Sequence, residues 1–203
     1  MTSPAAAKLL DAAVNAIRHR GYSGTTVDEI CRAAQVSKGA FFHHFHSKDA
    51  LAAAAAAHFS DRADALLFAA PALQVADPRA RVLAYLRLRR EILRGAPGDF
   101  TCLLGTIVQE AHESHPELTR ICGDHIFVHA GRIETMLAQA KAIYAPEADW
   151  SPKSLALFTQ AALQGAFVLA KAAGGPETAT HCVDHLIDYV ERLLNSEPER
   201  SAA

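Results

Sequence analysis

Apolar residues recur at helical spacing along most of the chain. They occupy positions i, i+3, i+4 and i+7 of two early segments, Leu10, Ala13, Val14 and Ile17, and then Val27, Ile30, Cys31 and Ala34. This spacing gathers apolar side chains on one face of a helix. Alternating runs of β-branched residues, which would indicate strands, are nearly absent. The pattern therefore predicts an all-α protein.

Capping residues, glycines and prolines divide the pattern into about nine helices. Thr26 and Glu29 have the spacing of a capping box, and Ser37 and Ser47 stand where the third and fourth helices begin. After the first helix, the expected helices cover approximately 26–34, 37–44, 47–69, 79–94, 101–113, 116–144, 152–173 and 177–194. The tail, 196–203, is expected to be frayed.

Length and composition suit a folded protein with one compact domain or two small ones. The chain has 203 residues, of which 50% are hydrophobic and 21% charged. Its longest unbroken apolar run, Ala50 to Ala57, is far shorter than the roughly 20 residues that span a bilayer. The four cysteines include no close pair and do not indicate a disulfide framework. We expect a cytoplasmic protein with free thiols and no membrane association.

The net charge of -2 argues at first against nucleic acid as a partner, because basic patches supply most of that affinity. The charge is unevenly divided, however. Residues 1–50 hold six basic and four acidic side chains, a net of +2, and the remaining fourteen basic and eighteen acidic side chains give -4. The division is consistent with a basic nucleic-acid-binding segment on an acidic helical body.

The two short helices at 26–34 and 37–44 are joined by a three-residue break, Gln35, Val36 and the capping Ser37, and predict a helix-turn-helix. Lys38 and Lys48 flank the second of them, and Gly39 lets the backbone approach a phosphate closely. The helix N-termini at Thr26 and Ser37 offer backbone N–H groups to phosphates. These features favour DNA binding.

The segment 21–51 resembles the DNA-binding domain of the TetR/AcrR family of transcriptional regulators. The resemblance rests on GYSGTTVDEI and on AAQVSKGAFFHHFHSKDAL, which match at many positions with fixed spacing. It implies a helix-turn-helix domain at 1–50, a fourth helix from about 47 that acts as connector, and a helical effector-binding and dimerisation domain at 51–195.

The resemblance also implies which residues contact DNA: Thr26, Ser37, Lys38, Gly39, Ala40, Phe42, His43 and Lys48. Phe42 stands where the family usually has a phosphate-binding Tyr, and the missing hydrogen bond is worth about 1 kcal/mol. Gln35 stands where the turn usually has Gly, which costs roughly 1 kcal/mol if the position requires a positive φ.

The last two helices of the family pair across a twofold axis, so the resemblance implies a homodimer. Its interface is expected at Leu155, Phe158, Ala162, Gly165, Val183, Leu186, Ile187 and Val190. In the alternative interpretation, both apolar stripes face their own core. Candidates for an effector pocket are Tyr85, Leu88, Leu104, Ile107, Val108, His112, Phe127 and Phe167.

Metal, thiol and catalytic chemistry have weaker support. Cys122, His125 and His129 lie at i, i+3 and i+7 and form a weak metal candidate, although a real site needs ligands from other helices. Cys102 lies near a helix N-terminus, where a thiol can become reactive. The chain has no Gly-rich phosphate loop and no G-x-S-x-G motif. We expect no metal or other cofactor and no catalytic residues.

The sequence thus predicts a homodimeric repressor that binds double-stranded DNA at a palindromic operator and is released by a small-molecule effector of unknown identity. One alternative is a metal- or thiol-responsive sensor of the same fold. Another is a helical ligand-binding protein or enzyme that lacks DNA binding.

Overall fold

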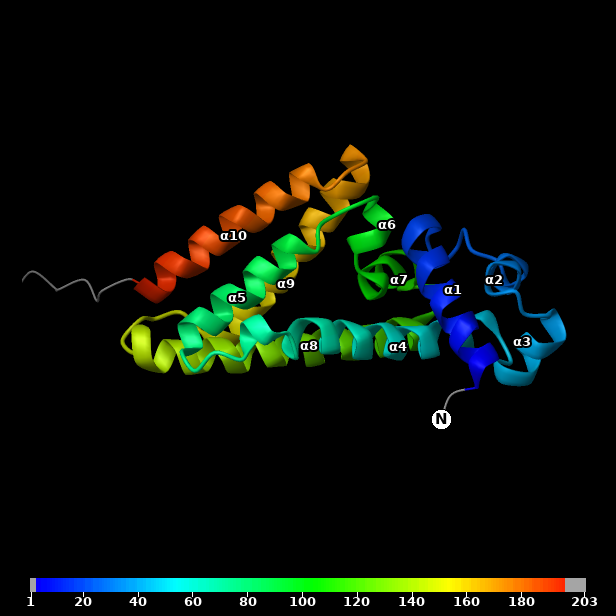
Figure 1. The fold of residues 1–203 in the computed structure, drawn as a ribbon, viewed down its shortest axis with the longest axis horizontal. Helices are drawn as coiled ribbons and strands as arrows, with labels where there is room; N and C mark the ends of the chain where they lie inside the picture. Colours follow the sequence, from blue (N-terminus) through cyan, green and yellow to red (C-terminus); the bar gives the residue numbers. More distant parts are fainter. Residues whose placement is uncertain (1–2, 196–203) are drawn as a thin grey trace, which may run out of the picture. The chain divides into compact units, whose positions relative to one another are not determined.

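The computed structural model of the protein describes residues 3–195, which form ten α-helices and one short 3-10 helix without a strand (Figure 1). The all-α prediction is confirmed. The expected frayed tail, 196–203, lies outside the described residues. In chain order the elements are α1 (Pro4–Arg20), α2 (Val27–Ala34), α3 (Lys38–His44), α4 (Lys48–Phe68), η1 (Pro71–Leu73), α5 (Pro78–Glu91), α6 (Pro97–Phe100), α7 (Leu103–Ala111), α8 (Pro116–Tyr144), α9 (Pro152–Ala173) and α10 (Glu177–Asn195).

The predicted helix starts are confirmed by their capping bonds. Ser37 Oγ accepts from the backbone N–H of Ala40 at 3.1 Å, and Ser47 Oγ accepts from that of Ala50 at 3.0 Å. Each bond satisfies one of the N–H groups that a first helical turn leaves without a partner. Local sequence alone therefore set where these helices begin.

The prediction differs from the structure between the fifth and seventh helices. α5 ends at Glu91 instead of continuing to Arg94, and the unpredicted single turn α6 follows it. Gly95 adopts a φ of +81°, and the Asp99 carboxylate accepts from the backbone N–H of Ala96 at 2.9 Å. One turn held by such a bond leaves no periodic pattern in the sequence.

Contacts divide the chain into two compact units. Unit 1 consists of residues 1–63 and 101–127, and unit 2 of residues 64–100 and 128–203. The core of unit 1 joins buried residues of α1 to α4 with residues of α7 and early α8, among them Leu103, Ile107 and Leu118. The segment 101–127 thus packs with the N-terminal helices, although its sequence assigned it to the effector-binding body. The functional boundary at residue 50 stays a prediction.

Unit 2 is built around α5, α9 and α10, which pack together (Figure 1). One side of α9 is buried in this unit, with Leu163, Phe167 and Ala170 in its core. By length and composition α9 is the one helix within residues 3–195 that could span a membrane, a test that buried core helices of water-soluble proteins also pass.

Candidate DNA-binding surface

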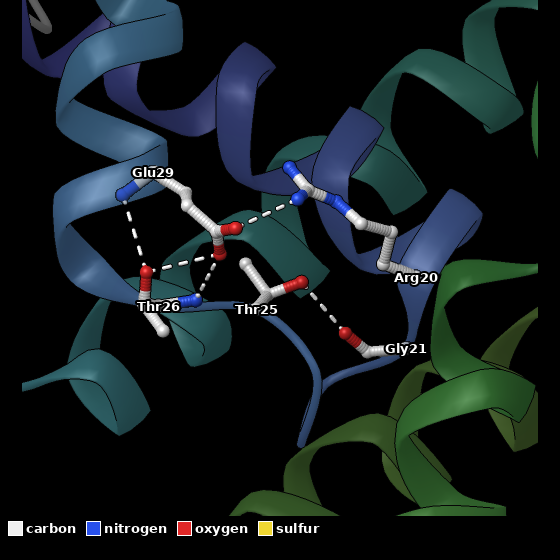
Figure 2. A network of polar contacts seen from close by, with 5 residues as sticks. All are labelled: Arg20, Gly21, Thr25, Thr26 and Glu29. Atoms are coloured by element: carbon white, nitrogen blue, oxygen red, sulfur yellow. Dashed lines mark hydrogen bonds and ion pairs between the residues drawn. The ribbon is translucent and has the colours of Figure 1, made fainter.

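The turn between α1 and α2 is fixed by a network of polar contacts (Figure 2). Thr26 Oγ1 accepts from the Glu29 backbone N–H at 3.2 Å, and Glu29 Oε2 accepts from both the backbone N–H and the hydroxyl of Thr26 at 2.9 Å. Arg20 Nη1 lies 2.7 Å from Glu29 Oε1, and the buried Thr25 hydroxyl donates to the Gly21 carbonyl at 2.7 Å. The predicted capping box is confirmed.

This network already uses the polar groups of Thr26, which the family resemblance places against a phosphate. Hydrogen bonds from Thr26, first from its backbone N–H and then from its hydroxyl, hold the pKa of Glu29 below its usual value. A phosphate at the start of α2 would therefore meet a Glu29 carboxylate that Arg20 partly neutralises. The role of Thr26 in DNA contact stays a prediction.

The recognition-helix candidate α3 has one buried side chain, the ring of Phe41. Phe41 is fully buried in the core of unit 1, while Phe42 is 54% exposed and stands edge-on to it, with the ring centroids 5.0 Å apart. Lys38 and His43 are exposed. A Cβ added at the exposed Gly39 would meet nothing closer than Ser37 Oγ at 3.9 Å, so packing inside the described chain does not require glycine there. The helix thus presents most of its surface outward.

The turn before α3 contains a strained residue. Gln35 adopts the left-handed conformation with φ 54° and ψ 41°, and it is the one non-glycine residue with positive φ between residues 3 and 195. The position therefore does favour the glycine that the family usually has, and Gln costs about 1 kcal/mol.

The two lysines flanking α3 lie in different surroundings. Lys38 is exposed, and its Nζ lies 2.8 Å from a carboxylate oxygen of Asp28, a hydrogen bond that holds the pKa of Lys38 above its usual value. Lys48 instead donates to the carbonyls of Tyr22 at 3.0 Å and Thr25 at 3.1 Å, and its Nζ lies 4.1 Å from the centre of the Tyr22 ring. Lys48 therefore also links the start of α4 to the turn that precedes α2.

A second set of contacts around the α1–α2 turn was missed by sequence reasoning. Tyr22 donates its hydroxyl hydrogen bond to Asp49, whose other carboxylate oxygen lies 2.8 Å from His115 Nδ1. Burial raises the pKa of Tyr22, and its hydrogen bond to Asp49 acts in the same direction. Burial also tends to raise the pKa of Asp49, but the hydrogen bonds with Tyr22 and His115 outweigh it and lower that pKa.

Glu110 makes the companion contact from α7. Its carboxylate accepts from the Ser23 backbone N–H at 2.9 Å, and a Cβ on Gly21 would lie 2.3 Å from its Oε1. Gly21 has a φ of +82°, so the backbone conformation favours glycine here, and a larger residue would also displace the Glu110 carboxylate from Ser23. No sequence signal pairs Glu110 or His115 with residues more than 60 positions away.

Comparison with known proteins identifies this arrangement. Residues 9–55 match the family described as bacterial regulatory proteins, tetR family. The chain is 27% identical over 163 residues to the transcriptional regulator AcuR of Cereibacter sphaeroides, covering 80% of this chain and 74% of that protein. It is 28% identical over 190 residues to the HTH-type transcriptional regulator BetI of Burkholderia thailandensis, covering 93% and 92%.

The fold agrees over nearly the whole chain. The crystal structure of the regulatory protein TetR from Rhodobacter sphaeroides superposes with a TM-score of 0.79 at 25% identity, covering 94% of this chain and 99% of that one. The segment 9–55 belongs to the TetR family. This TetR-family protein is a DNA-binding transcriptional regulator, and its relatives and fold are those of regulators and not of enzymes.

The structure distributes the predicted effector-pocket residues of this TetR-family protein over both units. Tyr85, Leu88 and Phe167 belong to unit 2. The five others belong to unit 1, where Leu104 and Ile107 are buried and Val108 packs against the same core, whereas His112 and Phe127 are exposed. A pocket formed by all eight residues stays a prediction.

The predicted dimer residues also separate into two groups. Five of them are buried inside unit 2, namely Leu155, Val183, Leu186, Ile187 and Val190. The stripe on α10 therefore faces its own chain, because α9 and α5 cover it. Ala162 is half-buried, and Phe158 and Gly165 are exposed on α9.

The weak metal candidate does not assemble. Within residues 3–195, no three His, Cys, Asp or Glu side chains form a group that could hold a metal ion. Cys122 is buried in the core of unit 1, and burial raises the pKa of its thiol to about 12. His129 instead contacts Tyr85 and Asp64 in unit 2. Cys102 caps α7, where its Sγ accepts from the Gly105 N–H at 3.5 Å.

Proposed function

We propose that the protein is a cytoplasmic homodimeric repressor that binds a palindromic operator and leaves it when a small molecule binds. The observation that carries the proposal is the outward surface of α3. One ring of the helix is buried, whereas Lys38, Gly39 and His43 are exposed, as a helix that enters a major groove requires. The DNA contacts proposed from the family resemblance are those eight residues of 26–48 given above.

The dimer is supported by a second apolar face on α9. Opposite its buried side, α9 exposes Leu157, Phe158, Ala161, Gly165, Val168 and Leu169. Tyr189 of α10 extends this face, since its ring stands 5.4 Å from that of Phe158. An exposed apolar face of this kind marks an interaction surface, and a twofold axis lets it cover itself.

The two helix-turn-helix domains of a dimer explain how a modest local charge can give specific DNA binding. A dimer places two recognition helices on half-sites one helical turn apart, about 34–36 Å. An effector that prefers the DNA-free state would move α4 and take the two α3 helices out of register with the grooves. α4 suits this role because it contributes residues to both units.

The test is fluorescence anisotropy of the full chain on DNA from its own upstream region, with a scrambled duplex as control. We expect saturable binding at low salt with two protomers, or a multiple of two, per site, and weak binding to the scrambled duplex. A folded dimer that shows no preference for the upstream DNA would contradict the proposal.

A further inference from the structure

A partly buried polar cluster lies among three helices of unit 2. We define the Asp64–His129 cluster by pairs of residues at helical spacing on each helix: Asp64 and Phe68 of α4, Tyr85 and Arg89 of α5, and His129 and Arg132 of α8. Residues three or four positions apart share one face of a helix, so each helix presents two of these side chains in one direction. None of the DNA contacts proposed above uses them.

Most polar groups of the cluster satisfy one another. The Tyr85 hydroxyl lies 2.9 Å from His129 Nε2, and His129 Nδ1 lies 3.3 Å from Asp64 Oδ1. The second carboxylate oxygen, Asp64 Oδ2, lies 3.1 Å from Arg132 Nη2. Burial lowers the pKa of His129 to about 4, and the Arg89 cation acts in the same direction, so His129 is neutral at pH 7. The charge of Asp64 is therefore balanced by Arg132.

Arg89 remains without such a partner. Its Nε is buried and has no hydrogen-bond partner, and no carboxylate of residues 3–195 lies within ion-pair distance of its guanidinium. The guanidinium lies 5.7 Å from the centre of the Phe167 ring. Arg89 is half-buried, with its Nε out of contact with solvent, so its charge is partly desolvated without a counter-charge among residues 3–195. Such a cation gains from pairing with an anion, which makes this guanidinium a candidate anion site.

The neighbouring side chains define what kind of anion fits. Phe68 stacks on Tyr85 with ring centroids 5.7 Å apart, and Phe167 lies under Arg89, so the surroundings of the charge are aromatic. Arg89 and Arg132 carry two positive charges and Asp64 carries one negative charge, so the cluster has one excess positive charge. A monoanion balances that charge, whereas a dianion would place a further negative charge beside Asp64. The planar guanidinium fork also matches a carboxylate in geometry.

We propose that Arg89 in the Asp64–His129 cluster binds a small monocarboxylate whose apolar body packs against the surrounding aromatic rings. This inference rests on the proposed function, because it names the chemical class of the effector. Asp64 and Phe68 belong to α4, so a carboxylate bound here changes the contacts of the helix that is proposed to move.

The test is isothermal titration calorimetry of the full chain without DNA. The probes are sodium benzoate and sodium hexanoate, each compared with its neutral amide, and inorganic phosphate. We expect at least one carboxylate to bind about tenfold more tightly than its amide and more tightly than phosphate, as a charge-assisted contact predicts. Two carboxylates that fail to bind, equal binding of the amides, or tighter binding of phosphate would overturn the proposal.

Two variants of α5 show whether Arg89 is responsible. Arg89→Gln is expected to weaken carboxylate binding about tenfold and to leave amide binding unchanged. Arg87→Gln removes the same charge from an exposed position of the same helix and is expected to change neither. If Arg89→Gln does not fold by circular dichroism, Arg89→Lys replaces it, and a loss of about threefold is expected because the fork geometry is gone. Equal losses in the Arg87 and Arg89 variants would overturn the proposal.

Parallel anisotropy measurements on operator DNA separate this inference from the proposed function. Carboxylate binding without release of DNA would support the anion site at Arg89 and contradict its role as the effector site. DNA release by another molecule, in a protein that binds none of the carboxylates, contradicts the anion site and leaves the repressor standing.

Discussion

α3 and α9 use their apolar residues in opposite ways. α3 buries one ring, Phe41, and exposes the side chains of Lys38, Phe42 and His43, while α9 buries one apolar face and exposes a second one. The first arrangement suits a polar partner that enters and leaves. The second suits a permanent partner, because water meets a continuous apolar surface until another protein covers it.

The polar groups of the two units differ in the same sense. In unit 1 they close helix ends and turns, as Thr26, Lys48 and Glu110 do. In unit 2 they form a partly buried cluster that contains an unpaired cation, Arg89. The polar groups of unit 1 therefore stabilise the candidate DNA-binding surface, whereas those of unit 2 leave the charge of Arg89 available to a ligand. Four predictions test this difference.

The largest effect is expected from the exposed face of α9. Phe158→Asp places a charge at its centre and should convert the dimer to a monomer, with operator affinity falling about 1000-fold as the second head is lost. Sedimentation velocity and anisotropy measure the two consequences. Ile143→Asp on α8, at a residue that is also exposed, is the control and should leave both unchanged. If the Phe158→Asp protein stays dimeric, the exposed face of α9 is not the dimer interface.

The next effect is a pH dependence of stability that originates in unit 2. The unfolded chain protonates His129 near pH 6.5, but the folded chain does so only near pH 4. Between these values the unfolded state binds more protons, so stability falls as pH falls. This contribution is about 2 kcal/mol between pH 7 and pH 5.

Urea unfolding of the His129→Gln variant at pH 7 and pH 5 checks this contribution. The variant should lose most of it, since Gln does not titrate. The exposed His112 provides the control, because His112→Gln should keep the full pH dependence of the wild type. Identical pH dependence in the wild type and His129→Gln would show that His129 is accessible to protons in the folded state.

The third effect separates the two lysines of unit 1. Lys38→Ala should weaken operator binding about tenfold, with little change in stability. It should also reduce the slope of the logarithm of the binding constant against the logarithm of the salt concentration by about 0.9 for each protomer. Lys48→Ala should in addition lower the free energy of unfolding by about 1 kcal/mol, because two carbonyls lose their donor. Anisotropy across salt concentrations and urea unfolding distinguish them. An unchanged salt slope in Lys38→Ala would mean that Lys38 stays with Asp28 and touches no phosphate.

The smallest effect concerns the turn before α3. Gln35→Gly should raise the free energy of unfolding by up to about 1 kcal/mol, because glycine adopts positive φ without strain. Operator affinity should stay within about twofold, since the geometry of α3 is retained. Ala33→Gly, at an exposed helical position of α2 two residues earlier, is the control and should lower stability instead. Destabilisation by Gln35→Gly would show that the Gln side chain contributes a contact that outweighs its strain.

The sequence predicted those parts of the site that depend on neighbours in the chain. Thr26 and Glu29 are three positions apart, and Ser37 precedes the helix that it caps, so their bonds follow from local spacing. Contacts across long separations could not be predicted. Glu110 meets Ser23 over 87 positions, and His129 meets Asp64 over 65.

The same limit explains why apolar stripes were harder to interpret than caps. Helical periodicity shows that Val183, Leu186 and Val190 share a face, but it is silent on whether α5 and α9 or a second protomer covers that face. For α9, both faces carry apolar residues, so only packing distinguishes the buried one from the exposed one.

By itself, the sequence determined the helices, their caps and the helix-turn-helix with its locally basic charge. These depend on backbone geometry and on residues a few positions apart, which the chain order fixes directly. Only the tertiary structure decided that α7 packs with the N-terminal helices, that α9 keeps an apolar face exposed, and that no carboxylate of residues 3–195 pairs with Arg89. Burial and charge pairing are properties of the three-dimensional neighbourhood, and that neighbourhood is set by packing between segments far apart in the chain.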